Sequence, residues 1–538
     1  MKTIRTTAAL ALAFSIAACS ESDSYTQETL VPPSPFHGIH GLTFTSDGKL
    51  LAGSVVGRAI YEVDTATGAT RIFEGPPEGM ADDIEEGPDG TLAWTAFLDG
   101  KVYARKPDGR LLTLAEGLPG LNSLAWTDDG RLFSTQVFLG DALYELDPSG
   151  AAPPRKIMEG MGGLNGFDFG PDGKLYGPLW FKKQVVRVDV DAATIETVAD
   201  GFGTPAAVNF TSAGELYAVD TERGHVYRVD TTNGDKTLVS EVAPAIDNLA
   251  FDADDNLYIT NMADNAVIAI DRETGEARTI VSGALAVAGG IALAVEDGEE
   301  VLYVADIFAL RKVDIRDGTV TEVARVFAAE IDYPLSVKVS NGRIALTGLT
   351  GGAVQILDQQ SGESLDLHHE FAAPSDAVAL ADGDVLVAEF ERGAIVRVDG
   401  NDWSNRTDIT TGLSGPAAIS FGADGFLYVS ENLGGSISRL NIDTGEHIAI
   451  AQGLSKPEGF DFMPDGRLIV AEVGKQRLVA IDMETGKRSI IKDKLPIGFE
   501  GPEGAPSIFI PSGVAVAENG DIYYSSDVDV AIYKLTKR

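Results

Sequence analysis

The chain is poor in thiols and imidazoles, with one cysteine and six histidines among 538 residues. A single cysteine cannot form an internal disulfide, and it leaves no other thiol for catalysis or for a zinc site. No run of 18 or more apolar residues occurs, so no transmembrane helix is predicted. The apolar fraction of 44% is ordinary for a globular protein, and the length allows two large cores.

Basic residues are also scarce, with 42 lysines and arginines against 81 acidic residues and a net charge of −39. Nucleic acid is therefore excluded as a predicted partner, because binding to phosphates needs a basic stripe. Two interpretations of the acidic excess stay open. It can be a solvated surface, or it can include sites for bound cations.

The N-terminus has the pattern of a targeting segment. Lys2 and Arg5 precede a short apolar stretch, Ala8–Ala18, which ends in small residues directly before Cys19. This pattern resembles a bacterial lipoprotein signal, which implies cleavage after residue 18 and lipidation of Cys19. Ser20 at the next position, in place of Asp, favours the outer membrane of a Gram-negative envelope. The alternative is an ordinary secretory signal. The lipid anchor is the only membrane contact expected.

One turn recurs twelve times, about every 42 residues, between short apolar runs. Asp-Gly and Asn-Gly supply the positive φ angles of a tight hairpin, so the flanking runs are predicted strands. The twelve turns are Asp47-Gly48, Asp89-Gly90, Asp129-Gly130, Asp172-Gly173, Ala213-Gly214, Asp255-Asn256, Asp297-Gly298, Asn341-Gly342, Asp382-Gly383, Asp424-Gly425, Asp465-Gly466 and Asn519-Gly520.

A period of 40–45 residues with four strands is typical of a β-propeller blade. The sequence therefore predicts an all-β fold of twelve four-stranded repeats. The last repeat ends before its fourth strand, so residues 26–31 are expected to close a ring. Two six-bladed rings are the main prediction, with Thr26–Val31 completing the sixth blade and Ala277–Val281 completing the twelfth. A single twelve-bladed ring is the alternative.

The predicted domains follow from this closure. They are a signal segment at 1–18, a tether and closing strand at 19–35, a first propeller at 36–275 and a second at 276–538. No linker rich in Pro or Ser separates the halves, so the rings are expected to pack together.

Residues just before each inner strand are predicted to meet at the mouth of the channel, whereas the Asp of each Asp-Gly turn is predicted to be structural. Aligned on the turns, the first ring presents a mostly polar set and the second a weaker one. The first set is His40, Asp82, Asn122, Asn165, Ala206 and Asp247, and the second is Gly289, Leu335, Asp376, Ala417, Glu458 and Ser512.

Two carboxylates and two amides make a candidate site for a hard cation. Asp82, Asn122, Asn165 and Asp247 all offer side-chain oxygens, and Ca²⁺ accepts a mixed shell of carboxylate, carbonyl and water oxygens. The alternative is that these side chains cap the channel backbone or bind water.

Several short motifs resemble the six-bladed calcium hydrolases, namely the gluconolactonase, senescence-marker-protein and luciferin-regenerating-enzyme family and the related paraoxonases. The resemblance covers roughly residues 36–275 and implies calcium at the ligands above, with His40 and Asp247 as catalytic residues. Its motifs are Phe36-His37-Gly38-Ile39-His40-Gly41, Ala81-Asp82-Asp83-Ile84-Glu85, Leu121-Asn122-Ser123-Leu124, Leu164-Asn165-Gly166-Phe167 and Ile246-Asp247-Asn248-Leu249. The second ring, with Lys456-Pro457-Glu458-Gly459-Phe460, is more similar to propeller repeats of the virginiamycin-lyase or NHL kind.

Aromatic residues are predicted in loops on the same face as the ligand positions: Phe97, Phe138, Trp180 and Phe181. An aromatic rim over a polar floor suits a small amphipathic substrate such as a lactone or ester. Alternatively, these rings pack between blades or against the second ring.

The sequence thus predicts a calcium-dependent hydrolase of lactones or esters. There is no Gly-x-Ser-x-Gly motif, which disfavours a serine hydrolase. A non-enzymatic ligand-binding or scaffold propeller and a calcium-assisted lyase stay open as alternatives, because the fold alone does not decide function. The sequence does not indicate an oligomeric state.

Overall fold

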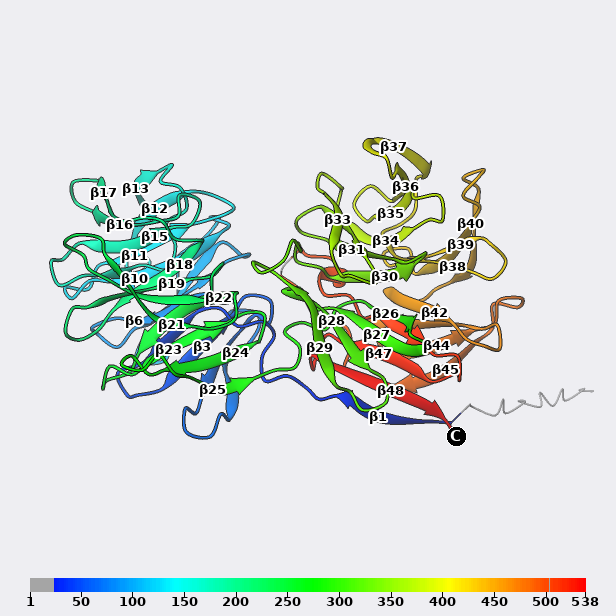
Figure 1. Ribbon diagram of the computed structural model, residues 1–538, viewed down its shortest axis with the longest axis horizontal. Helices are drawn as coiled ribbons and strands as arrows, with labels where there is room; N and C mark the ends of the chain where they lie inside the picture. Colours follow the sequence, from blue (N-terminus) through cyan, green and yellow to red (C-terminus); the bar gives the residue numbers. More distant parts are fainter. Residues whose placement is uncertain (1–23, 503) are drawn as a thin grey trace, which may run out of the picture.

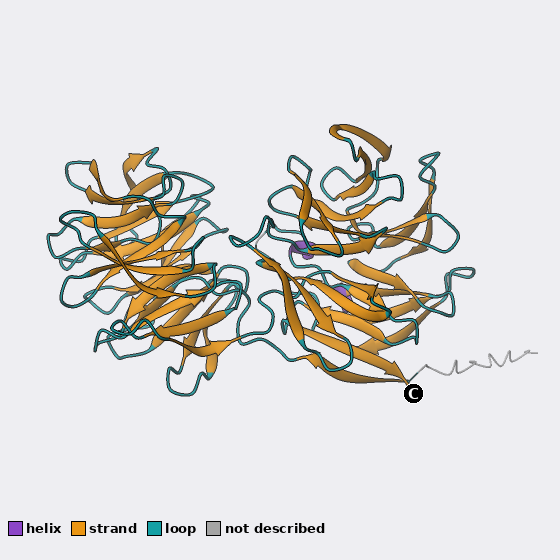
Figure 2. Ribbon diagram, in the orientation of Figure 1, coloured by secondary structure: helices purple, strands orange, loops and turns teal. Residues whose placement is uncertain are grey.

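The computed structural model describes residues 24–502 and 504–538, in which two rounded bodies lie side by side (Figure 1). Strands make up both bodies (Figure 2), and the described helices are two short 3₁₀ turns, η1 (Val473–Lys475) and η2 (Ser507–Phe509). Neither has the length to cross a bilayer. The predicted signal segment and Cys19 lie outside the described residues.

The prediction of an all-β chain of four-stranded repeats is confirmed, because the described strands form twelve four-stranded antiparallel sheets. The first six sheets, called ring one, comprise β2 (Leu42–Phe44), β3 (Leu50–Ser54), β4 (Ala59–Val63), β5 (Thr70–Glu74), β6 (Ala81–Glu86), β7 (Leu92–Ala96), β8 (Lys101–Arg105), β9 (Leu111–Ala115), β10 (Leu121–Trp126), β11 (Leu132–Gln136), β12 (Ala142–Leu146), β13 (Arg155–Glu159), β14 (Asp168–Phe169), β15 (Leu175–Leu179), β16 (Gln184–Asp189), β17 (Thr194–Ala199), β18 (Pro205–Phe210), β19 (Leu216–Asp220), β20 (His225–Val229), β21 (Lys236–Glu241), β22 (Ile246–Phe251), β23 (Leu257–Asn261), β24 (Ala266–Ile270) and β25 (Ala277–Ser282).

The other six sheets, called ring two, comprise β1 (Tyr25–Val31) together with β26 (Ile291–Glu296), β27 (Glu299–Ala305), β28 (Ala309–Asp314), β29 (Val320–Arg325), β30 (Ser336–Ser340), β31 (Arg343–Gly348), β32 (Ala353–Asp358), β33 (Ser364–His368), β34 (Pro374–Ala379), β35 (Val385–Glu389), β36 (Ala394–Asp399), β37 (Asp402–Thr410), β38 (Pro416–Phe421), β39 (Leu427–Glu431), β40 (Ser436–Leu440), β41 (His447–Gln452), β42 (Pro457–Phe462), β43 (Leu468–Glu472), β44 (Arg477–Ile481), β45 (Arg488–Asp493), β46 (Val514–Val516), β47 (Ile522–Ser526) and β48 (Ala531–Lys537).

The innermost strands contact one another in two closed cycles. In ring one the cycle runs from β2 through β6, β10, β14 and β18 to β22, which returns to β2. In ring two it runs from β26 through β30, β34, β38 and β42 to β46, which returns to β26. The arrangement is that of two rings of six sheets, and a single ring of twelve would need β22 to continue to β26 instead.

The closing strand differs from the prediction. Strand β1 pairs with β48 in the last sheet of ring two, and β25 stays beside β24 in the sixth sheet. The predicted crossover of Ala277–Val281 is therefore wrong, and ring one ends after Ser282. The physical reason is that β24 and β25 are joined by a short turn, so their pairing costs little loop entropy. Ring one is inserted in the chain between β1 and β26.

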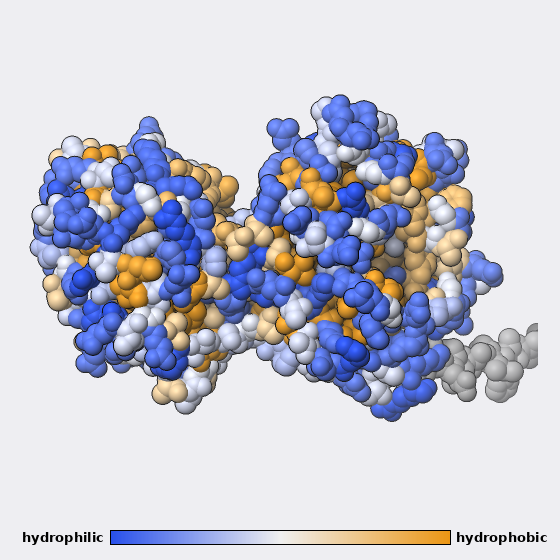
Figure 3. Space-filling model, in the orientation of Figure 1, coloured by the Kyte–Doolittle hydropathy of each residue, from blue (hydrophilic) through white to orange (hydrophobic). Residues whose placement is uncertain are grey.

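Burial falls from the inner part of each sheet to its rim. The second strands of the first six sheets are buried along their whole length, as in β7 and β19, because both faces pack against neighbouring sheets. The outermost strands are largely exposed, as in β17. Hydrophilic residues cover much of the visible face of both rings (Figure 3), which agrees with a solvated acidic surface.

The repeated turns have the expected geometry. Gly48 has φ +82°, and its N–H donates to the Thr45 carbonyl at 2.8 Å. Asp47 accepts from the Thr45 hydroxyl at 2.6 Å, so this carboxylate is structural as predicted. In the one turn without glycine, Asp255 takes the left-handed conformation at φ +59°.

The rings are packed firmly together. Arg325 of ring two forms an ion pair with Asp264 of ring one at 2.6 Å and donates to the Pro244 carbonyl at 3.1 Å. Met262 of ring one lies in the same apolar cluster as Phe308 of ring two. Paired charges and shared apolar burial fix one ring against the other, so loops of ring two have a set position at the mouth of ring one.

Candidate functional site

The mouth of ring one is built from a repeated irregularity in its inner strands. The β-sheet register shifts between Ala81 and Ile84, between Leu121 and Leu124, and between Ile246 and Leu249. Each shift is a β-bulge, which bends a strand and redirects its side chains. The bulges contain Asp82, Asn122 and Asp247, so three predicted ligands are aimed by the same backbone feature.

Buried hydroxyl groups on the second strands support these bulges. Thr95 accepts from the Asp83 N–H at 3.0 Å and donates to the Asn122 carbonyl at 2.7 Å. Thr260 repeats this role, accepting from the Asn248 N–H at 3.0 Å and donating to the His40 carbonyl at 2.7 Å. Sequence reasoning missed these residues, although a polar residue within an apolar strand was a visible signal.

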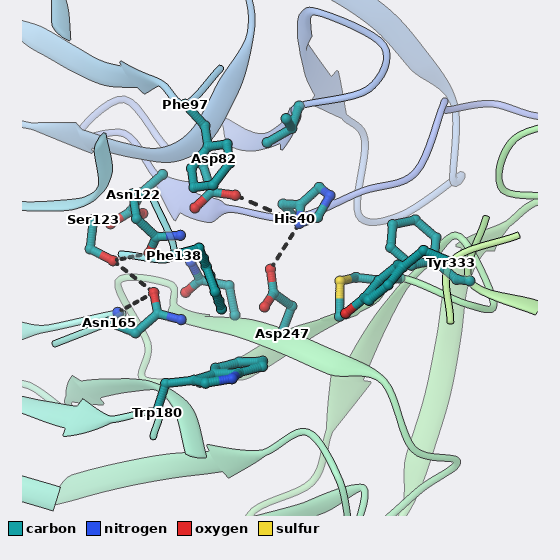
Figure 4. A pocket seen from close by; sticks show the side chains of 17 residues that line it. His40, Asp82, Phe97, Asn122, Ser123, Phe138, Asn165, Trp180, Asp247 and Tyr333 are labelled. Atoms are coloured by element: carbon teal, nitrogen blue, oxygen red, sulfur yellow. Dashed lines mark hydrogen bonds and ion pairs between the residues drawn. The ribbon is translucent and has the colours of Figure 1, made fainter. Parts of the chain in front are cut away.

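The mouth encloses a cavity of about 130 Å³ (Figure 4). All six aligned positions of ring one line it, so the structure brings together the predicted set. The lining is His40, Val55, Asp82, Asp83, Phe97, Asn122, Ser123, Phe138, Asn165, Gly166, Trp180, Ala206, Asp247, Asn248, Met262, Phe308 and Tyr333.

His40 lies between two carboxylates on the floor of this cavity. Its Nδ1 is 3.3 Å from Oδ2 of Asp247 and 3.7 Å from Oδ1 of Asp82. Burial acts to lower the pKa of His40, but the hydrogen bond and charge of Asp247, with the charge of Asp82, raise it above its ordinary value. The imidazole is thereby oriented, and its protonated form is stabilised by two acidic neighbours.

Asp82 is a buried acidic side chain whose charge is offset only by His40. Burial raises its pKa well above the ordinary range, the charges of Asp247 and Asp83 raise it further, and His40 acts in the opposite direction. Three acidic side chains thus share a buried space with one imidazole. Such a site favours either protons or a bound cation.

Asp83 faces the same cavity but has a structural task. Its carboxylate accepts from the Ile84 N–H at 2.9 Å and from the Leu124 N–H of the next sheet at 3.0 Å. Burial raises the pKa of Asp83 to about 7. Glu85 and Asp168 likewise accept from the N–H groups of Trp126 and Phe210 in the next sheet, each at 2.9 Å. These carboxylates join neighbouring sheets around the channel, a role that sequence reasoning did not predict.

The two amides offer unused acceptor capacity. Ser123 Oγ lies 2.8 Å from Oδ1 of Asn122 and 3.1 Å from Oδ1 of Asn165. Asn165 Oδ1 also accepts from the Gly166 N–H at 2.9 Å, so the hydroxyl proton and this N–H occupy two of the four lone pairs of the two amide oxygens. With the carboxylates of Asp82 and Asp247, the donors are all oxygens of the type that Ca²⁺ prefers. Within residues 24–502 and 504–538, no group of three or more His, Cys, Asp or Glu is arranged to hold a metal, so such a site depends on the amides.

Three of the four predicted aromatics line the cavity. Phe138 stands between Phe97 and Trp180, with ring centroids 6.2 and 5.4 Å away. Phe181 does not line the cavity; it lies outside Phe138, with a centroid distance of 5.7 Å, and is 59% exposed. Trp180 also packs against Phe327 of ring two at 6.0 Å. The rim therefore combines cavity-lining aromatics with a contact between the rings.

Two residues of ring two, Phe308 and Tyr333, also line the cavity. They lie in the β27–β28 and β29–β30 connections of ring two, whereas aromatic residues at the rim were predicted only from the loops of ring one. Phe308 packs against His40 with a centroid distance of 5.8 Å, and Tyr333 packs against Phe308 at 6.1 Å. The candidate site belongs to both rings.

The corresponding position in ring two has only a small cavity. Its cavity measures about 20 Å³ and is lined by Asp376, Ala417, Glu458 and Ser512 of the predicted set. Gly289 and Leu335 do not line it, and their neighbours Gly290 and Ser336 do. Lys338 Nζ lies 3.7 Å from Oδ2 of Asp376 and balances its charge.

An apolar cluster lies over this second mouth. Leu335 and Ala417 of ring two pack in it with Val56 of ring one. Among the described residues, the mouth of ring one therefore has the larger cavity and that of ring two the smaller.

Comparisons with known proteins give no family for this chain. No family model matches the chain, and no curated protein matches it, so the resemblance to the calcium hydrolases stays a prediction. Similar solved structures include the extracellular domains of a one component system and of a hybrid two component system, both from B. thetaiotaomicron. The first is 12% identical with a TM-score of 0.32, covering 95% of this chain and 82% of that one. The second is also 12% identical with a TM-score of 0.32, covering 93% and 75%.

Virginiamycin B lyase from Staphylococcus aureus is 13% identical with a TM-score of 0.24, and the match covers 60% of this chain and 96% of that one. Matches this weak carry no argument about substrate or reaction. The twelve four-stranded sheets, with their inner strands in two closed cycles, make this chain an all-β propeller protein whose open cavity lies where the two rings meet.

Proposed function

We propose that the protein is a calcium-dependent hydrolase of lactones or esters, anchored at the cell envelope. The observation that supports this most is His40 beside Asp247 and Asp82, on the floor of a cavity with two amide oxygens and an aromatic rim. An imidazole oriented by a carboxylate is the arrangement of a general base for water.

Asp82, Asn122, Asn165 and Asp247 would hold the calcium ion. Bound calcium would supply a positive charge that polarises the carbonyl of the substrate. The excess of buried carboxylates over cations supports this assignment, because a buried charge is costly unless it is paired.

The remaining chemistry belongs to the side chains of the chain itself. His40 would accept a proton from water, and Asp247 at 3.3 Å would stabilise the imidazolium that results. Asp247 can alternatively attack the carbonyl carbon as a nucleophile, which breaks the C–O bond to the alcohol and forms an anhydride. The alcohol would leave with a proton from the His40 imidazolium, and water activated by the same imidazole would hydrolyse the anhydride. Phe97, Phe138 and Trp180 would contact the apolar part of the substrate.

Calorimetric titration with calcium chloride tests the metal, and a panel of lactones and aryl esters assayed with and without a chelator tests the reaction. We expect one calcium ion to bind, hydrolysis to disappear in chelator and to return with added calcium. Hydrolysis that persists in chelator would contradict the calcium assignment. Ligand binding without turnover would favour the alternative of a non-enzymatic binding propeller.

The proposed anchor has its own test. Changing Cys19→Ser removes the only thiol, so we expect the protein to move from the membrane fraction to the soluble fraction without unfolding. Ser20→Ala is the matched control, because it changes the neighbouring residue and leaves the thiol for lipidation. Cell fractionation and immunoblotting measure the distribution. A Cys19→Ser variant that stays with membranes would rule out lipidation at this residue.

A further inference from the structure

The most distinctive feature of the ring-one cavity is that ring two supplies part of its wall. Residues 326–335 connect β29 to β30 in ring two, and from this connection Tyr333 reaches the cavity of ring one. In Figure 4 its hydroxyl end faces the side of the cavity where Asp247 lies. No other tyrosine lines this cavity.

The backbone around Tyr333 is strained. Tyr333 has φ +41°, and Phe327 in the same connection has φ +68°. Ile307, which precedes the other ring-two wall residue, has φ +40°. Bulky and β-branched residues rarely adopt this left-handed conformation, and it persists where surrounding contacts enforce it, often at functional sites. The strain shows that these loops are held in place.

Specific contacts hold the connection. The side chain of Gln355 donates to the Glu330 carbonyl at 2.5 Å and accepts from the Asp332 N–H at 3.3 Å. His369 Nε2 lies 2.6 Å from Oδ2 of Asp332. Ile331 is buried in the apolar cluster shared by the two rings. Tyr333 is therefore presented to the cavity by a fixed support.

The Tyr333 hydroxyl is a donor without a protein acceptor. It makes no hydrogen bond to the described part of the chain; its side chain lines the cavity and is 39% exposed, so water or a ligand can reach it. Burial raises the pKa of Tyr333, and the charges of Asp332 and Asp247 raise it further, so the phenol keeps its proton. A protonated phenol that faces a cavity can donate one hydrogen bond to a ligand.

We propose that Tyr333 completes the ring-one site by donating this hydrogen bond to an uncharged acceptor oxygen of the substrate. The proposal rests on the hydrolase function proposed above, and it makes Tyr333 a specificity-determining residue. The ring of Phe308 packs against Tyr333 and also against His40. Ring two then acts as a wall that selects compounds with a carbonyl or ring oxygen, while the carboxylates of ring one disfavour anionic ligands.

The test compares the wild type with Tyr333→Phe, both as the full chain. Calorimetry measures the affinity of each protein for two probes. The first probe is a phenyl-substituted δ-valerolactam, which resists hydrolysis and offers a carbonyl oxygen. The second is phenylcyclohexane, which has a similar shape and no acceptor. Tyr333→Phe should weaken lactam binding about three- to tenfold, the value of one neutral hydrogen bond, and leave phenylcyclohexane binding unchanged.

The control is Tyr428→Phe, which also removes a phenol from ring two. Tyr428 donates to Asp424 at 3.0 Å in a repeated turn, away from the cavity, so both probes should bind this variant as they bind the wild type. An equal loss for both probes in Tyr333→Phe would mean that the ring only packs, and would overturn the proposal. No lactam binding to the wild type would also count against it.

The binding readout separates this proposal from the proposed function. If Tyr333→Phe loses lactam affinity selectively but the wild type hydrolyses no lactone or ester, the donor assignment stands and the hydrolase fails. If the wild type hydrolyses lactones with calcium and Tyr333→Phe has unchanged affinity, KM and kcat, the hydrolase stands and the donor assignment fails.

Discussion

Replacing Asp247→Ala is expected to abolish hydrolysis, lowering kcat/KM by about 10³-fold or more, and to weaken calcium binding. The change removes a proposed calcium ligand and the carboxylate that lies 3.3 Å from His40. The fold should persist, because the carboxylate of Asp247 contacts the imidazole of His40 and does not join two sheets as Asp83 does. Enzyme kinetics, calcium titration and melting temperature with and without calcium measure the three effects.

Two further variants sharpen this prediction. His40→Gln should reduce catalysis more than calcium affinity, because the imidazole is proposed as a base and not as a ligand. Glu458→Gln is the matched control in ring two, where burial raises the pKa of Glu458 well above its usual range. If Asp247→Ala leaves both hydrolysis and the melting temperature in calcium unchanged, the metal-hydrolase hypothesis fails and the ligand-binding propeller becomes the better interpretation.

Prolines in the closing strand should unfold ring two and spare ring one. In the double variant Gln27→Pro, Glu28→Pro, two neighbouring residues that face Leu535 and Lys534 of β48 lose their N–H groups. Because successive N–H groups of a strand point to opposite sides, one of the two donates to β48 in the wild type. The carbonyl of β48 that loses its donor costs about 1–3 kcal/mol, and the proline ring adds steric strain. Ring one should survive, because β22 closes directly on β2.

Calorimetry and limited proteolysis measure this outcome. We expect a new transition at lower temperature and digestion of residues after 282, with a resistant fragment from ring one. Glu28→Ala is the control, since its side chain is exposed and the backbone pairing is kept. A single unchanged transition in the proline variant would show that β1 contributes little to closure.

The sequence predicted the repeat architecture well, because the Asp-Gly and Asn-Gly turns report local backbone geometry. Even the turn without glycine follows the same hairpin, with Asp255 in the left-handed conformation. The partner of the closing strand was predicted wrongly. Residues 26–31 and 277–281 have similar β-strand patterns, and their pairing depends on chain connectivity that residue types do not encode.

The site residues of ring one were predictable from the sequence, and those of ring two were not. His40, Asp82 and Asp247 were found by aligning the repeats, because the inner strands bring equivalent positions to one axis. Phe308 and Tyr333 were not found, since they lie in connections of ring two and reach the cavity through the packing of one ring on the other. Contacts between rings leave no periodic pattern in the sequence, so residues of this kind need a structure.

The insertion of ring one between β1 and β26 has a consequence for the order of events during synthesis. The six sheets of ring one are contiguous in the chain, so this ring can close once residue 282 has emerged. Strand β1 emerges before it, yet its partner β48 follows all the other described strands in the chain. Strand β1 therefore stays unpaired until the strands of both rings, β2 to β47, have been produced. An unpaired strand is an aggregation hazard during that interval, and the wall that carries Tyr333 is completed only after the cavity that it serves.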